Sequence, residues 1–354
     1  MSMVSTNETI SRQHGRSATP AVLVLFAVLV CLILVSITIG RYDLDVLKVI
    51  RILADNLIPA SNADWTVLEE QVVELVRLPR ILAAVLVGAG LAASGAALQG
   101  LFRNPLVDPN IIGVTSGAGF GGTLAILSGV FGYGLLAIAF LFGLASVMIV
   151  KVLASSRGRT SVLALVLAGV IISAFFGSAI SIVKLLADPH QKLLAITYWL
   201  MGSLASTNYE DLLLMAVVMV PALAVIYLMR FQINIISLGE EKARALGSPV
   251  ATVQWAVLGA TAVISAGVVA CCGIIGWVGL VIPHVARAIS GPDHGRLLPV
   301  SILLGAIYML LVDNIARTVT TAEIPVGIIT SLIGVPVFAV LLRRMQSRGG
   351  WKSD

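Results

Sequence analysis

Histidine, cysteine and buried carboxylate side chains carry most enzyme and metal chemistry, and they are scarce in this chain. Of 354 residues, four are histidines and three are cysteines, and Cys271 and Cys272 are adjacent within an apolar run. That spacing suggests neither a disulfide framework nor a cysteine-ligated metal site. The histidine inside a long apolar stretch is His284, which follows Pro283. We expect it to be a hydrogen-bonded packing residue rather than a ligand or a proton relay.

The sequence also lacks an energy source of its own. It contains no G-x-x-x-x-G-K-[ST] loop. Gly117, Gly119 and Gly122 satisfy G-x-G-x-x-G, but no strand precedes them and no acidic residue follows at the expected distance. Because small residues at such spacings let helices approach closely in lipid, we interpret them as packing residues. Proton-coupled carriers usually bury carboxylates at mid-membrane. No Asp or Glu lies centrally in any apolar stretch, and Asp313 lies near one end, four residues before Arg317.

The composition explains why polar groups are so few. Hydrophobic residues make up 58% of the chain and charged residues 12%, with a mean hydropathy of +1.01. A soluble domain carries about 25% charged residues, so a water-soluble globule of this size is excluded. A membrane-spanning helix needs about 20 apolar residues. A charged residue at the centre of a span is costly, so charge-free stretches mark the spans. They run from Ala21 to Gly40, Ile81 to Phe102, Asn110 to Val150, Thr160 to Val183, Leu212 to Met229, Val250 to Ala286, Leu297 to Val312 and Ile324 to Leu342.

Two of these stretches, which begin at Asn110 and Val250, are close to twice the length of a single span. Both have glycine-rich midpoints, at 129–134 and 273–279. Each therefore predicts two helices, which gives an all-α polytopic membrane protein with ten transmembrane helices. Residues 1–19 are then a cytoplasmic tail, 20–344 the ten-helix domain and 345–354 a second cytoplasmic tail.

Charge asymmetry sets the orientation. With both termini in the cytoplasm, fifteen Lys and Arg residues fall inside and eight outside, which follows the positive-inside rule. In the outer segment 41–80 we predict an amphipathic helix over 46–53 and a turn at 59–62. Residues 193–209 are uncharged but polar, and we predict a short helix in or near the outer interface, with Tyr198 and Trp199 as interfacial anchors. If this segment spans the membrane instead, every later segment inverts.

One inner loop predicts a short capped helix over about 237–247. Ser237 followed by Glu240 matches a capping box, Gly247 matches a helix terminator, and Pro249 prevents continuation. Together they predict a helix of about nine residues, a length that is marginal in water on its own. The helix therefore rests on another surface, either a partner protein or its own bundle.

This run resembles the coupling-helix segment of the permease subunits of type II ABC importers, which take up iron–siderophore complexes, haem and cobalamin. Four other stretches resemble the same family: Arg77-Leu-Pro-Arg80 with residues 87–95, Gln99 through Asn104-Pro-Leu106 to Gly113, residues 276–284, and Glu323-Ile-Pro-Val-Gly327 with residues 334–338. The similarity covers about 41–344. The family's ten-helix subunit agrees with the number of spans predicted from the charge-free stretches.

The resemblance implies a homodimer in the cytoplasmic (inner) membrane of a bacterium or archaeon. Its path would be lined mainly by the fifth and tenth helices. Two copies of a separate ATPase would bind ATP and Mg²⁺, so this chain would be no enzyme and would hold no cofactor or metal. The other partners implied are membrane lipid, a metal-chelate substrate and a periplasmic or lipid-anchored binding protein, with no nucleic acid.

The resemblance also assigns site residues. The coupling segment would be Leu238, Gly239, Glu240, Glu241, Lys242, Ala243, Arg244, Ala245, Leu246 and Gly247, with Glu240, Glu241, Lys242 and Arg244 making polar contacts and Ala243, Ala245 and Leu246 packing on the ATPase. The binding protein would dock on Arg77, Arg80 and Arg317. The alternative for these arginines is local pairing, of Glu74 with Arg77 and Asp313 with Arg317, or lipid phosphate binding.

The cytoplasmic gate implied by the resemblance comprises Asn104, Pro105, Leu106, Ser161 and Val162. Apolar rings of this kind hold back hydrophilic cargo because they resist hydration. Ser173, Ser178 and Ser181 on the fifth helix either face the path or bond back to their own helix.

The expected cargo is an iron(III)–siderophore, with cobalamin, haem and molybdate as alternatives within the family. An ion-coupled secondary transporter is the alternative from a different class, but it needs an intramembrane carboxylate or a broken-helix ion site. A membrane enzyme would need polar catalytic residues clustered at one depth, which the sequence does not show.

Overall fold

Ten helices of the computed structural model correspond to the ten predicted spans. The structure describes residues 19–40, 42, 44–55, 64–156, 159–160 and 162–347. Among these residues, eight helices are long and apolar enough to cross a membrane and two apolar helices are shorter. The ten are α2 (Thr19–Thr38), α5 (Leu78–Leu101), α6 (Val114–Leu127), α7 (Tyr133–Ala154), α8 (Val162–Leu186), α10 (Tyr209–Leu228), α13 (Val250–Cys272), α14 (Val278–Ser290), α15 (His294–Thr318) and α16 (Val326–Ser347). The all-helical prediction is confirmed.

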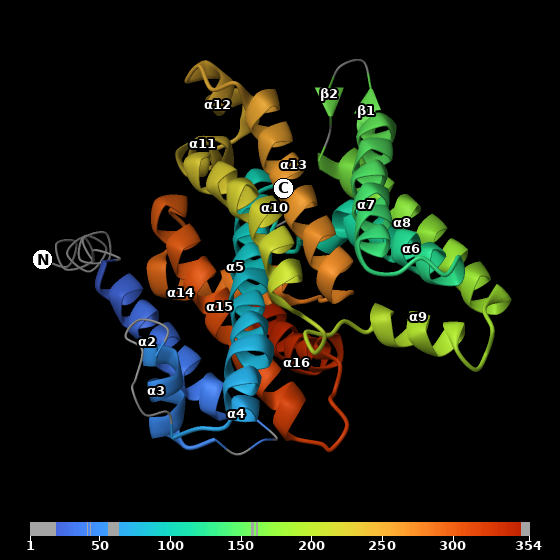
Figure 1. Ribbon diagram of the computed structural model, residues 1–354. Coiled ribbons are helices and arrows are strands. Elements are labelled where there is room, and N and C mark those ends of the chain that lie inside the picture. Colours follow the sequence, from blue (N-terminus) through green and yellow to red (C-terminus); the bar gives the residue numbers. More distant parts are fainter. Residues whose placement is uncertain are drawn as a thin grey trace, which may run out of the picture.

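Short elements connect the ten helices. They are α3 (Val46–Asp55), α4 (Val67–Gln71), the π-helical turn η1 (Val72–Arg77), the 3-10 turn η2 (Pro109–Ile112), α9 (Lys192–Leu200), α11 (Arg230–Ser237), α12 (Glu240–Ala245) and a two-residue hairpin of β1 (Ser155–Ser156) and β2 (Arg159–Thr160). Figure 1 shows α12 and the hairpin at one end of the bundle and α3 with α4 at the opposite end. These are the α12 end and the α3 end below.

Both double-length stretches break where the glycines predicted. Gly129 and Gly132 separate α6 from α7, and Gly273 ends α13, each with a positive φ. Glycine adopts such angles without the penalty that a Cβ would impose, so these positions stop a helix inside an otherwise continuous apolar run.

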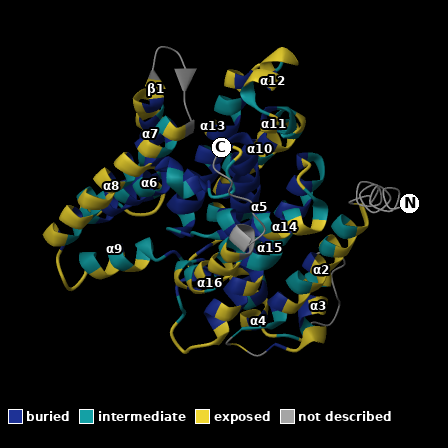
Figure 2. Ribbon diagram, turned by 180° about the vertical axis from the view of Figure 1, so that it is seen from behind, coloured by how far each residue is buried: buried dark blue, intermediate teal, exposed yellow. Residues whose placement is uncertain are grey.

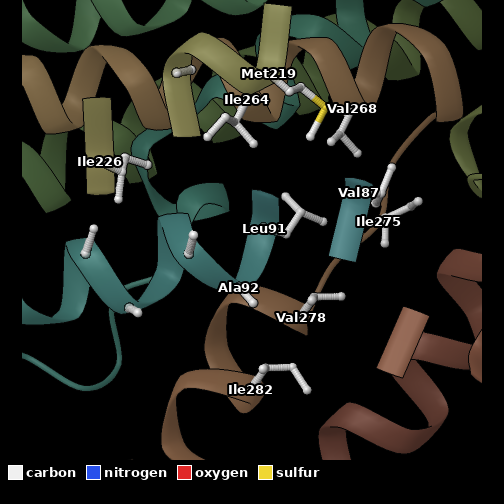
Figure 3. Close-up of a cluster of buried hydrophobic side chains, with 14 of the residues drawn as sticks. Val87, Leu91, Ala92, Met219, Ile226, Ile264, Val268, Ile275, Val278 and Ile282 are labelled. Carbon is white, nitrogen blue, oxygen red and sulfur yellow. The ribbon is translucent and has the colours of Figure 1, made fainter. Parts of the chain in front are cut away.

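Helix α5 is the centre of the bundle. Twenty of its 24 residues are buried, and Figure 2 shows it enclosed by the other helices. In Figure 3, Leu91 of α5 lies between Met219 of α10 and Val278 of α14. An apolar helix that is buried all round fits the inside of a membrane bundle.

Backbones approach closely around α5 because small residues line the contacts. A Cβ placed on Gly88 would lie 2.1 Å from the Gly305 carbonyl oxygen on α15, and one on Gly95 would lie 1.8 Å from that of Gly279 on α14. Close approach lets dispersion hold helices together where water exclusion cannot. On α6, a Cβ at Gly117 would lie 2.5 Å from the Ser146 Cβ, so that glycine serves helix packing as interpreted.

Replacing Gly88 with alanine should therefore destabilise the bundle. The added methyl group has no room against the Gly305 carbonyl, and overpacking of this kind costs about 1–3 kcal/mol. Thermal unfolding of the purified protein measures the loss. Gly259→Ala is the matched control, because nothing lies within 4 Å of its added Cβ and its φ is ordinary. Equal unfolding temperatures for the two variants would contradict this packing argument.

The connection between α5 and α6 folds back into the bundle. Helix α6 has 14 residues, about 21 Å at 1.5 Å per residue, which is shorter than the roughly 30 Å hydrocarbon layer. Pro109 packs on Gly279, and a Cβ at Gly169 of α8 would lie 2.0 Å from the Ile111 carbonyl oxygen. The predicted span that begins at Asn110 therefore starts within this connection, and the helix itself begins at Val114.

Both helices predicted outside the ten spans form. Helix α3 buries Val49 and Ile52, and its Lys48 Nζ donates to Glu69 at 2.8 Å, which raises the pKa of Lys48. Helix α9 is short, as predicted. The half-buried Trp199 packs its indole on the position of Gly122 in α6, whereas Tyr198 is exposed. Their roles as interfacial anchors stay predictions.

Some predictions fall outside the described residues. These are the turn at 59–62 and almost all of both tails, residues 1–18 and 348–354. At the other boundary, α16 continues to Ser347, beyond the predicted start of the second tail at 345.

Candidate coupling helix, arginine cluster and gate

Helix α12 begins differently from the prediction. Ser237 is the last residue of α11, and its hydroxyl donates to the Asn234 carbonyl oxygen at 2.6 Å. The residue before α12 is Gly239, with φ 117 and no side-chain cap. The predicted Ser237–Glu240 capping box is therefore wrong. Instead, Glu240 accepts from Gln254 Nε2 at 3.0 Å and pairs with Arg244 at 3.4 Å.

The end of α12 is the one predicted. Gly247 has φ 77, its N–H donates to the Arg244 carbonyl oxygen at 2.9 Å, and the Ser248 N–H donates to that of Ala243 at 3.0 Å. This pair of bonds is a Schellman motif. The helix is six residues long rather than about nine, because its start was misplaced.

Exposure divides the predicted coupling residues into two groups. Ala243 is 0% exposed, so it packs within its own chain and is not available to a partner. Leu246 is 65% exposed and Leu238 is also exposed, at the two ends of the helix. Between them, Glu241, Lys242, Arg244 and Ala245 are exposed. A short helix that presents two leucines beside charged groups suits a protein partner.

The predicted docking arginines lie inside the protein. Arg80 donates from Nε to Asp313 at 2.8 Å and from Nη1 to Glu323 at 2.9 Å. Arg317 Nε lies 3.5 Å from the second Asp313 oxygen. The side chains of Arg80, Asp313 and Arg317 are 6%, 0% and 5% exposed. The alternative of an Asp313–Arg317 pair is therefore present, within a larger buried cluster.

The remaining contacts of these arginines are also internal. Arg77 is buried and donates from Nη1 to the carbonyl oxygens of Ile37 at 2.6 Å and Thr38 at 3.0 Å. Arg317 donates to the Ser36 carbonyl oxygen at 2.7 Å. The arginines thus join the end of α2 to α5 and α15. Direct contact with a docked protein would need exposed guanidinium groups, which this arrangement does not offer.

The predicted gate is described only in part. Asn104, Pro105 and Leu106 are half-buried, and Asn104 Oδ1 accepts from the Leu106 N–H at 2.9 Å, which closes a tight turn after α5. Ser161 lies outside the described residues, and so does the side chain of Val162. The contact across the gate stays a prediction.

Two of the three serines on α8 bond back to their own helix, which is one of the two predicted alternatives. Ser178 donates to the Ala174 carbonyl oxygen at 3.1 Å, and Ser181 donates to that of Gly177 at 3.0 Å. Both hydroxyls therefore bond back to their own helix.

Buried polar residues that the sequence did not single out lie toward the α12 end. His294 begins α15 and is buried, with Nδ1 2.8 Å from Asn234 Oδ1 and Nε2 3.2 Å from the Ala96 carbonyl oxygen. Asp108 is buried and accepts from the Asn110 N–H at 2.6 Å. In the described part of the chain, no group of three His, Cys, Asp or Glu residues could hold a metal ion.

His284 is a packing residue, as expected. Its Nδ1 lies 2.9 Å from the Leu280 carbonyl oxygen of the same helix, and its ring meets Phe338 edge-on at 6.1 Å.

Comparisons with known proteins agree with this architecture. The family model described as the FecCD transport family matches residues 27–344. The molybdate import system permease MolB of Haemophilus influenzae is 44% identical over 92% of this chain and 96% of its own length. The hemin transport system permease HmuU of Yersinia pestis is 40% identical over 78% of this chain and 84% of its own.

A solved structure has the same fold. It is titled as an inward-facing conformation of a metal-chelate type ABC transporter, with 43% identity, a TM-score of 0.82, and coverage of 92% of this chain and 99% of that one. The chain therefore belongs to the FecCD transport family: it is a multi-pass permease subunit of a prokaryotic type II ABC importer, and it is not itself an ATPase.

Proposed function

We propose that two copies of this chain form the translocation path of an ATP-driven importer in the inner membrane, with the α12 end in the cytoplasm. The observation that carries the proposal is α12. It is held by a Schellman end and by the buried Ala243, and it is flanked by the exposed Leu238 and Leu246. A separate ATPase would cover these leucines and move α12 when it binds and hydrolyses ATP.

The proposed homodimer would cover apolar side chains on α8 and α16. Phe175 of α8 is 64% exposed and Leu332 of α16 is 70% exposed in the single chain. In the proposed dimer these two helices, the fifth and tenth spans, face the second copy and the path. Leu106 and its neighbours after α5 would close the cytoplasmic side.

The buried arginines would serve the binding protein indirectly. They fix α2, α5 and α15 to one another at the α3 end, and Arg80 holds Glu323 in the loop before α16. A soluble binding protein would dock on the surface that this cluster shapes, rather than on Arg77, Arg80 or Arg317 themselves. Both termini would lie in the cytoplasm, which follows from the distribution of Lys and Arg.

Molybdate is the first candidate for the cargo. A relative that is 44% identical over almost the full length of both chains is named a molybdate permease. An iron(III) chelate is the second candidate, since permeases of Helicobacter pylori named for iron chelatin transport are 41% identical over 77% of this chain.

Uptake by the complete complex decides between the two. The permease, its ATPase and its binding protein would be reconstituted in liposomes and supplied with radiolabelled molybdate or a radiolabelled ferric siderophore. We expect ATP-dependent accumulation of molybdate that excess unlabelled molybdate suppresses and a non-hydrolysable ATP analogue does not support. Accumulation of the siderophore alone would replace molybdate as the cargo.

A further inference from the structure

Trp277 has a backbone conformation that tryptophan rarely adopts. It precedes α14 with φ 70 and ψ −25, in the left-handed region. Arg103 is the other non-glycine residue with positive φ in the described chain. A bulky residue in this region is strained and persists only where its surroundings fix it, and such residues gather at functional sites. The preceding residue, Gly276, could adopt a positive φ without strain, yet the positive φ falls on Trp277.

The surroundings that fix Trp277 come from α16. A Cβ placed on Gly334 would lie 2.5 Å from the Trp277 Cβ and 2.8 Å from its Cγ. One turn further along α16, the Phe338 ring lies 6.3 Å from the indole and 6.1 Å from the His284 imidazole. His284 Nε2 is buried and has no hydrogen-bond partner among the described residues. Among the described side chains, the contact between α14 and α16 is therefore steric and aromatic, and no hydrogen bond or ion pair joins the two helices.

Helix α16 is otherwise held at its start. Glu323, three residues before the helix, pairs with Arg80. A Cβ at Gly327 would lie 2.3 Å from the Met201 carbonyl oxygen and 2.5 Å from that of Ile274. Beyond these contacts the helix exposes large apolar side chains, among them Leu332, Val335, Val337 and Val340.

The helix is also weakened immediately after the Trp277 contact. Pro336 lies inside α16, two residues beyond Gly334. Proline cannot donate the backbone hydrogen bond of its turn, and it clashes with the preceding turn, so it is a common point of bending. The fixed contact and the bending point thus lie side by side near the middle of the helix.

We propose that Trp277 is the fulcrum of α16, a positioning residue that holds the helix at Gly334 while the segment from Pro336 to Ser347 tilts during transport. This inference rests on the proposed role of α16 in lining the path. The strained backbone of Trp277 keeps its side chain aimed at Gly334. The glycine allows the close contact, and the aromatic contacts with Phe338 and His284 can slide because they carry no directional bond.

The test compares three variants in the complete, reconstituted complex. Trp277→Gly removes both the backbone strain and the fulcrum, and we expect uptake per ATP hydrolysed to fall at least about tenfold while ATPase activity persists. Trp277→Phe keeps the aromatic contact and should retain most of the coupling. Gly334→Ala crowds the contact and should also lower uptake per ATP, whereas Gly259→Ala, with no neighbour within 4 Å, should not.

The double variant Trp277→Gly/Gly334→Ala is the decisive arm. Removing the Trp277 Cβ makes room for the new methyl group, so its uptake per ATP should equal that of Trp277→Gly alone. Additive losses would overturn the proposal. So would a fall of uptake, ATPase activity and unfolding temperature together in Trp277→Gly, which would show a merely structural residue. If the unmodified complex shows no ATP-driven uptake, the proposed function fails instead.

Discussion

Replacing Leu246 with aspartate should abolish ATP-driven uptake while the permease stays folded. Leu246 is 65% exposed in the isolated chain, so an aspartate is solvated there and costs the free protein little. In the complex the same side chain would be enclosed by the ATPase, where a carboxylate without a partner is costly. Loss of such an interface anchor costs about 2 kcal/mol or more, which is about a thirtyfold loss of affinity.

The matched comparison is Ala243→Asp, three residues earlier. Ala243 is 0% exposed, so its replacement should lower the unfolding temperature of the permease itself. Leu246→Asp should leave that temperature unchanged and lose binding of the ATPase in a pull-down assay. An unchanged affinity for the ATPase in Leu246→Asp would remove α12 from the proposed interface.

Replacing Asp313 with alanine should destabilise the permease more than any other single change in the arginine cluster. The carboxylate is 0% exposed and faces Arg80 at 2.8 Å and Arg317 at 3.5 Å. Its removal leaves Arg317 buried without a carboxylate and Arg80 with Glu323 alone. Breaking a buried ion pair from one side costs about 3–5 kcal/mol. The measurement is the free energy of unfolding, or the unfolding temperature, of the purified protein.

Glu323→Gln is the control for this variant, because Glu323 is 24% exposed and its loss leaves the Asp313 contacts intact. We expect a clearly smaller drop in stability. If Asp313→Ala unfolds at the unmodified temperature but no longer binds the soluble binding protein, the cluster is a docking site and not a structural one.

The sequence predicted the spans well because the rule behind them is local. A membrane helix must be free of charge over about 20 residues, and the Gly-rich breaks at Gly129 and Gly273 divide the long runs without reference to the rest of the fold. The end of α12 was equally local, since Gly247 alone supplies the positive φ that a Schellman end requires. The start of α12 was misplaced because Ser237 can either cap a following helix or end a preceding one. In the structure it is the last residue of α11.

The candidate site was harder to predict because its partners are distant in sequence. Arg80 and Asp313 are 233 residues apart, and Arg80 and Glu323 are 243 apart. No spacing rule relates such positions. The docking role of the arginines therefore came from the family resemblance, and the residues alone offered only local pairing or lipid phosphate binding. The close contact of Trp277 with Gly334 is hidden for the same reason. In the sequence, Trp277 lies between two short apolar segments, and this pattern does not indicate a positive φ.

The central claim is that this chain is a conduit moved by a separate ATPase, and reconstitution tests it most directly. Liposomes that contain the permease alone, under a proton or sodium gradient, are compared with liposomes that contain the permease, its ATPase and its binding protein with ATP. We predict accumulation of radiolabelled cargo only in the second preparation, and its loss when ATP hydrolysis is blocked by vanadate. Accumulation by the permease alone under the ion gradient would contradict the account.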